Sequence, residues 1–277
     1  MPVALVIAPR FDNATEYSYD WSREAVEILK HGGYTVIDMG GGTVRRRDVE
    51  EKIRNADMVV FYNHGTEDAL WGSRDEPVID TLNAMLLSGR ECYTMACLSA
   101  KKLGVEAYKL GCKAYWGYCE PFSFTTDAAD VFKKFANEGL RLRIIEKVSW
   151  KTALEKTRQL GQELSEKLLD EGKMVASICM KMNAENLRCY NGEPPSTTCF
   201  FRRTAIKLFG ARLGWRITRS FAASVAFLLS SLAIYAMNRL HVLAFSHVFE
   251  LSYSLMVVSA LLALSDLVKK IKLIAGR

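Results

Sequence analysis

Short apolar runs alternate with stretches of helical periodicity along the first half of the chain. The runs cover residues 3–8, 34–39, 57–62, 91–96 and 112–117. Helical patterns lie between them at 21–30, 47–55, 78–87 and 100–110, the last with Ser99 as its expected N-cap. Strands that are apolar throughout are buried on both faces. The pattern therefore predicts an α/β fold with a mostly parallel sheet and helices on both faces.

The segment from 126 to 198 predicts the end of this domain. Residues 126–138 and 150–171 have helical periodicity, while 174–180 and 186–190 are typical of a final strand or strand pair. Residues 191–198 combine Asn, Gly, Pro and Ser as a linker does. We therefore expect the globular domain to cover residues 1–195.

Two apolar segments near the C-terminus predict a transmembrane helical hairpin at 220–268. Residues 220–238 form 19 positions without a charge, close to the ~20 needed for a membrane-spanning helix. The second run, 251–265, reaches that length when it is extended back through 242–249. A pair of helices buried in a larger core is the alternative interpretation.

The positive charge of the chain is concentrated around this hairpin. From Cys199 onward there are eleven Lys and Arg residues against two acids, a net +9, so residues 1–198 carry −3 of the formal +6. This distribution does not favour nucleic-acid binding by the folded domain and favours a lipid membrane as partner. Residues 196–219 are expected to form a basic amphipathic linker and 269–277 a basic tail, both cytoplasmic by the positive-inside rule. The prediction is a two-helix multi-pass membrane protein with its globular domain in the cytoplasm, in which the hairpin can also mediate oligomers.

The cysteine pattern argues against both disulfides and a structural metal. There are seven cysteines, an odd number, without a CxxC pair or a Cys/His spacing suited to zinc. This composition indicates a reducing compartment. The N-terminal residues MPVALVIAP lack a basic region before the apolar run, so they are expected to form the first strand and not a signal peptide.

His64 and Cys97 follow two apolar runs that are expected to be adjacent strands. Ligands of open parallel sheets bind beyond the carboxyl ends of the strands, where both residues would lie. Of the other histidines, His241 and His247 belong to the apolar C-terminal segments, and His31 lies at an expected helix end. An imidazole beside a thiol promotes thiolate formation and later protonates a leaving amine. The alternative is a histidine bonded to backbone and an ordinary buried cysteine.

The segments FYNHG and YTMACLSA resemble the active-site strands of caspase-like cysteine peptidases, closest to the gingipain, clostripain and CHAT-like branch. The later segments GYCEPFSFTTDAADVFKKFANEGL, WKTALEKTRQ and NLRCYNGEP are similar to the elements that follow the Cys strand in CHAT domains. The resemblance covers about residues 1–195. It implies a caspase-like fold and endopeptidase activity without a metal or other cofactor.

The resemblance also assigns roles to individual residues. His64 matches the general base, Cys97 the nucleophile, and Gly65 with the Cys97 amide the oxyanion site. The residues Gln-Ala-Cys of caspases are replaced by Met-Ala-Cys, so a preference for aspartate is not implied.

Specificity in this family depends chiefly on the residue before the cleaved bond, the P1 residue. The loops expected to contact it are residues 10–20 and 117–124. Asp12, Asp20 and Glu120 could pair with a basic side chain and Arg10 with an acidic one, and Asp20 is expected at the start of the first helix. Three acids against one base favour a basic P1 residue. The alternative is that all four are ordinary solvated loop charges.

The sequence therefore predicts a membrane-anchored cysteine endopeptidase that acts on protein or peptide substrates. One alternative is a non-catalytic or regulated caspase-like interaction module at the membrane. Another is a small-ligand-binding α/β domain that uses the same crevice.

Overall fold

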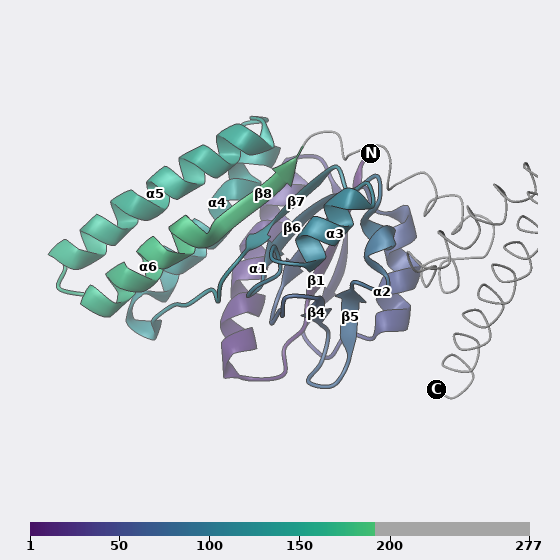
Figure 1. The fold of residues 1–277 in the computed structure, drawn as a ribbon, viewed down its shortest axis with the longest axis horizontal. Helices are drawn as coiled ribbons and strands as arrows, with labels where there is room; N and C mark the ends of the chain where they lie inside the picture. Colours follow the sequence, from purple (N-terminus) through teal and green to yellow (C-terminus); the bar gives the residue numbers. More distant parts are fainter. Residues whose placement is uncertain (192–277) are drawn as a thin grey trace, which may run out of the picture. The chain divides into compact units, whose positions relative to one another are not determined.

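The central element of the fold is a six-stranded sheet with strand order β2-β1-β3-β6-β7-β8 (Figure 1). The computed structural model describes residues 1–191 of the chain. The first five of these strands are parallel and β8 runs antiparallel to β7. Their bounds are β1 Val3–Ala8, β2 Thr35–Gly40, β3 Met58–Tyr62, β6 Glu91–Met95, β7 Ala114–Tyr118 and β8 Leu187–Asn191. The predicted α/β class with a mostly parallel sheet is confirmed.

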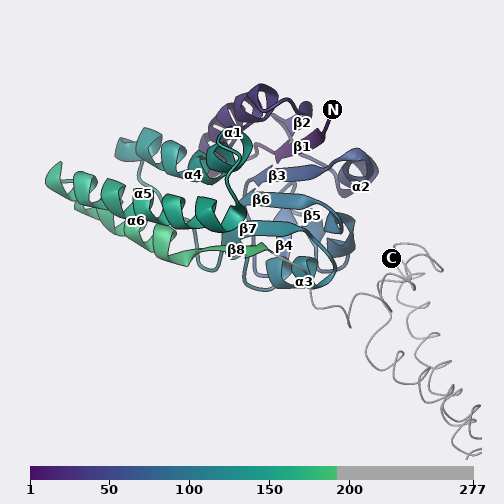
Figure 2. The same cartoon turned by 90° about the horizontal axis from the view of Figure 1, so that it is seen from above.

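Helices cover both faces of this sheet (Figure 2). One face is covered by α1, α4 and α5, with α6 packed on α5, and the other by α2, α3 and a small hairpin of β4 and β5. The bounds are α1 Asn13–His31, α2 Arg46–Lys52, α3 Leu103–Lys109, α4 Ala129–Ile144, α5 Trp150–Asp170, α6 Met174–Asn186, β4 Ala69–Trp71 and β5 Pro77–Asp80. Short 3-10 turns occupy Ile53–Asn55, Ala84–Leu87 and Thr126–Ala128.

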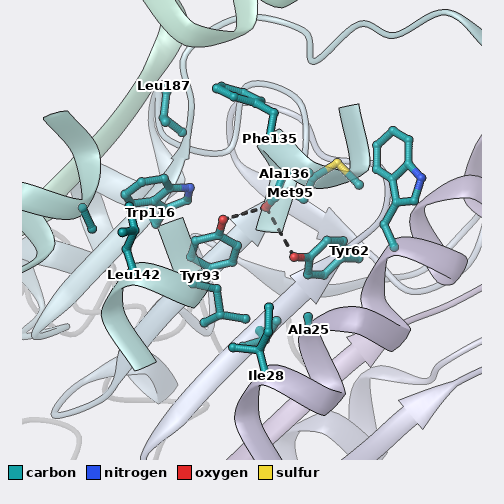
Figure 3. Close-up of a cluster of buried hydrophobic side chains, with 14 of the residues drawn as sticks. Ala25, Ile28, Tyr62, Tyr93, Met95, Trp116, Phe135, Ala136, Leu142 and Leu187 are labelled. Carbon is teal, nitrogen blue, oxygen red and sulfur yellow. Dashed lines mark hydrogen bonds between the residues drawn. The ribbon is translucent and has the colours of Figure 1, made fainter. Parts of the chain in front are cut away.

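Strand alternation divides the hydrophobic core into two layers. In β1, Val6 packs into the layer under α1 and α4, whereas Leu5 and Ile7 pack into the layer under α2 and α3. The larger layer contains aromatic side chains from three neighbouring strands (Figure 3). There the Tyr93 hydroxyl donates to the Ala136 carbonyl at 2.6 Å. The Tyr62 hydroxyl lies 3.5 Å from the same carbonyl and donates to the side-chain oxygen of Asn137, so both buried hydroxyls have partners.

The prediction of a helix at 78–87 is wrong, because this segment forms β5 followed by a 3-10 turn. Asp80 and Asn83 explain the break. The Asp80 carboxylate accepts from the Leu82 amide at 2.7 Å, and the Asn83 side chain accepts from the Asp80 amide at 2.8 Å. Side chains that bond to neighbouring backbone favour turns over helix.

The strand expected at 174–180 is also wrong, since these residues begin helix α6. Their Val and Ile content suggested a strand, but Ala176, Met180 and Ala184 are buried at helical spacing. Gly172, with a φ of 76°, allows the chain to reverse sharply between α5 and α6. The other expected strand, at 186–190, is confirmed as β8.

The expected linker 196–219, hairpin 220–268 and tail 269–277 lie outside the described residues. Within residues 1–191, no helix combines the length and apolarity that crossing a bilayer requires. The membrane hairpin and the domain boundary at 195 therefore stay predictions.

Candidate active site

His64 and Cys97 follow neighbouring strands at the same register. Strands β3 and β6 pair in parallel, with Tyr62 opposite Met95. His64 and Cys97 each come two residues after this pair in the chain. Both residues line one cavity of about 100 Å³. The expected adjacency of their strands is confirmed. The site lies beside the point where the strand order reverses between β1 and β3, as expected for ligand sites in open sheets.

Asn63 fixes the backbone from which His64 projects. Its buried side chain donates to the Pro9 carbonyl at 2.5 Å and accepts from the His64 amide at 2.5 Å. Its own amide donates to the Met95 carbonyl at 3.3 Å. One residue thus connects the carboxyl ends of three adjacent strands, β1, β3 and β6. This role of Asn63 is not predicted by the sequence pattern, although Asn63 directly precedes His64.

Asp12 binds the imidazole of His64. The distance from Asp12 Oδ2 to His64 Nε2 is 2.9 Å, and the Phe11 ring lies 5.8 Å from the imidazole between centroids. With the ionised carboxylate accepting from Nε2–H, the neutral ring has Nδ1 as its proton acceptor. Partial burial alone would raise the pKa of Asp12, but hydrogen bonds from Thr15 and His64 outweigh it and lower this pKa. The carboxylate therefore stays ionised at neutral pH.

The same carboxylate also determines where helix α1 begins. Asp12 is the N-cap, with Oδ1 accepting from the Thr15 amide at 2.9 Å, while the Thr15 hydroxyl accepts from the Asp12 amide at 2.9 Å. This reciprocal capping box holds the loop after β1 in one conformation. The cap therefore positions the carboxylate that contacts His64.

The thiol of Cys97 is partly buried and uncharged in this geometry. Burial raises the pKa of Cys97, only partly offset by backbone hydrogen bonding. Its Sγ lies 3.9 Å from the Phe122 carbonyl oxygen. If Cys97 acts as a nucleophile, its thiol has to transfer its proton to a base as it reacts.

A strained turn follows Cys97. Leu98 has a φ of 58°, in the left-handed region that residues with a side chain seldom adopt. The Ser99 hydroxyl is buried and donates to the Ala96 carbonyl at 3.0 Å, next to Thr94 Oγ1 at 2.7 Å. Ser99 is not the N-cap that was expected, because α3 begins only at Leu103. Its contacts hold the turn instead.

Gly65 lies directly against the backbone of the Cys97 turn. A Cβ at Gly65 would be 2.6 Å from the Cys97 carbonyl oxygen and 2.9 Å from the Ala96 side chain. Only glycine allows the two loops to approach this closely. The approach brings the two amides assigned to the oxyanion site, those of Gly65 and Cys97, into neighbouring loops.

None of the four charged residues proposed for substrate recognition lines the cavity beside Cys97. Two of them lie next to it, because Asp12 contacts His64 and the Glu120 carbonyl accepts from the Leu98 amide at 3.4 Å. Asp20 lies within α1, not at the start of the helix as expected, and pairs with Lys133 at 3.1 Å. Glu120 and Arg10 are exposed, with the Arg10 guanidinium 5.4 Å from the Tyr19 ring centroid. Arg10 and Asp12 line a neighbouring shallow depression over the loop after β1, which shares Ala14 with the cavity beside Cys97.

No group of three or more His, Cys, Asp or Glu side chains within residues 1–191 could hold a metal ion. The cysteines described there are all free thiols. Cys97, His64 and Asp12 supply the site with a thiol, an imidazole and a carboxylate.

Comparison with models of known protein families gives no match, and no curated protein matches the chain. The assignment of a function therefore depends on the residues themselves.

Proposed function

We propose that the chain is a cysteine endopeptidase with Cys97 as nucleophile and His64 as base. The observation that carries the proposal is that both residues follow paired strands in register and line one cavity. The Asp12 carboxylate, hydrogen-bonded to His64 Nε2, would orient the imidazole. Cys97, His64 and Asp12 would then be the nucleophile, the base and the group that orients the base. The caspase-like resemblance of these strands agrees with this reading.

The reaction follows from these assignments. His64 Nδ1 accepts the Cys97 proton while Sγ attacks the carbonyl carbon of the scissile peptide bond. The C–N bond of the resulting tetrahedral intermediate then breaks, and His64 returns the proton to the leaving amine. Water, deprotonated by His64, hydrolyses the thioester to release the carboxylic acid and restore the thiol. The Gly65 and Cys97 amides would stabilise the oxyanion both when the thioester forms and when it is hydrolysed.

We further propose that residues 220–268 hold this domain at a membrane as a helical hairpin, with residues 1–195 in the cytoplasm. The support is the length of the charge-free run and the basic residues on both flanks. Substrates would then be proteins or peptides close to the inner leaflet. Oligomers through the hairpin belong to the same proposal.

A regulated or non-catalytic interaction module is the second candidate. The raised pKa of Cys97 favours it, because the thiol is protonated in the described geometry. A regulated enzyme would need substrate or a partner to bring the thiol and imidazole into contact.

Hydrolysis of a quenched-fluorescence peptide library by the detergent-solubilised full chain tests the proposal. We expect activity that is lost in Cys97→Ala and reduced at least about 100-fold in His64→Ala. The control is Cys179→Ala, which removes another partly exposed thiol, on α6, and should leave the rate unchanged. Equal rates for the unmodified chain and Cys97→Ala would exclude Cys97 as the nucleophile. The interaction module would then be the remaining candidate function.

A further inference from the structure

The cavity beside Cys97 has a lining that determines which side chain it can accept. Helix α1 supplies Ala14, Thr15 and Ser18, and the strand ends and the loop after β7 supply the rest. The full lining is Ala14, Thr15, Ser18, Asn63, His64, Met95, Ala96, Cys97, Phe122 and Phe124. We propose that this cavity is the specificity pocket and that it takes an uncharged aliphatic P1 side chain. This inference rests on the proposed peptidase function and replaces the basic P1 residue expected from the sequence.

The size of the cavity favours a side chain of small or medium size. Its volume is about 100 Å³. A cavity of ~150 Å³ in a protein core holds benzene, so this one is too small for an aromatic ring. Side chains with up to about four heavy atoms, such as those of Ala, Val, Leu and Met, match the available space.

The walls that set this size are held by aromatic packing. The Phe124 ring lies 5.0 Å from Trp21 and 5.1 Å from Tyr17, and the Phe122 ring lies 5.0 Å from Tyr118. These are tilted and edge-to-face contacts, the arrangements that aromatic pairs prefer. Widening the cavity for a longer side chain would disturb this cluster.

The polar groups of the lining already have partners. The Ser18 hydroxyl donates to the Thr15 carbonyl at 3.1 Å, and the Thr15 hydroxyl donates to the Asp12 carbonyl at 2.8 Å. Asn63 is bonded to Pro9, and His64 to Asp12.

Arg10, Asp20 and Glu120 are absent from the lining, and the Asp12 carboxylate is bonded to His64. A charged P1 side chain would therefore enter without a counter-charge, which is strongly unfavourable.

A positional-scanning peptide library with each P1 residue, used with the full chain, tests the inference. We expect Leu, Val, Met and Ala at P1 to be cleaved at least about tenfold faster than Lys, Arg, Asp or Glu. The variant Ala14→Leu fills the cavity from the exposed first turn of α1 and should lower cleavage after Leu by at least about tenfold. Cleavage after Ala should change less. Glu16→Leu is the matched control, because it adds the same side chain to the same helix outside the cavity.

Preferred cleavage after Lys, Arg or an acid would overturn the inference and leave the peptidase assignment intact. An Ala14→Leu variant with an unchanged P1 profile would do the same. Failure to cleave any peptide, with no difference between the chain and Cys97→Ala, would overturn both.

Discussion

Among the individual residues of the site, Asp12 combines two roles, as the cap of helix α1 and as the partner of His64. A matched pair of substitutions separates them. Asn caps a helix as well as Asp does but carries no charge, whereas Ala neither caps the helix nor carries a charge. We expect Asp12→Ala to lower the free energy of unfolding by about 1 kcal/mol and Asp12→Asn by only a few tenths.

Both Asp12 variants should lower kcat at least about tenfold with little change in KM, because an imidazole without its carboxylate is less well oriented as a base. Urea unfolding and steady-state peptide hydrolysis give the two quantities. Full activity in Asp12→Asn would mean that Asp12 only caps helix α1 and does not orient His64.

The thiol of Cys97 makes a prediction about pH. Because burial raises its pKa above the ordinary value, the reactive thiolate is scarce at neutral pH and increases as the pH rises. We expect the rate of Cys97 alkylation by iodoacetamide to rise about tenfold per pH unit up to at least about pH 8.5. Mass spectrometry of the Cys97 peptide separates this site from the other thiols. A rate that is already constant below pH 7 would instead indicate a thiolate paired with protonated His64.

Among the helices, α5 packs unusually closely against α4 and α6 at Gly161. A Cβ there would lie 2.6 Å from the Ala184 side chain and 2.7 Å from the Phe135 ring. Overpacking costs about 1–3 kcal/mol, whereas replacing a helical Gly by Ala gains at most about 1 kcal/mol. We therefore expect Gly161→Ala to lower the free energy of unfolding by about 1 kcal/mol in urea titrations. The exposed Gln159→Ala on the same helix is the control, and a stabilised Gly161→Ala would contradict this packing.

The elements that sequence patterns predicted well are the central strands, because apolar runs buried on both faces are distinctive. Hairpin β4–β5 and helix α6 were missed for local reasons. The first depends on side-chain bonds of Asp80 and Asn83 to nearby backbone, and the second has Val and Ile on its surface.

The residues of the candidate site also divide into those that the sequence patterns could predict and those that they could not. His64 and Cys97 could be found because they follow predictable strands. The contacts of Asn63 with Pro9 and of Asp12 with His64 depend on the conformation of the loop after β1, for which the sequence carries no periodic signal.

For the whole molecule, the prediction concerns residues 192–277, which lie outside the described part. A 19-residue charge-free segment flanked by basic residues predicts insertion into the bilayer. We expect the full chain to sediment with membranes, to resist extraction by alkaline carbonate and to dissolve in detergent. Release by carbonate would contradict a spanning hairpin and favour peripheral association.

The most direct measurement of the central claim is covalent labelling of the full chain by a peptidyl acyloxymethyl ketone. The Cys97 thiolate would displace the acyloxy group, which leaves as a carboxylate, and form a thioether that mass spectrometry locates. We predict an adduct on Cys97 that is absent in Cys97→Ala and forms at least about 100-fold more slowly in His64→Ala. An adduct that forms equally fast without His64, or that forms only on other cysteines, would contradict a His64–Cys97 catalytic pair.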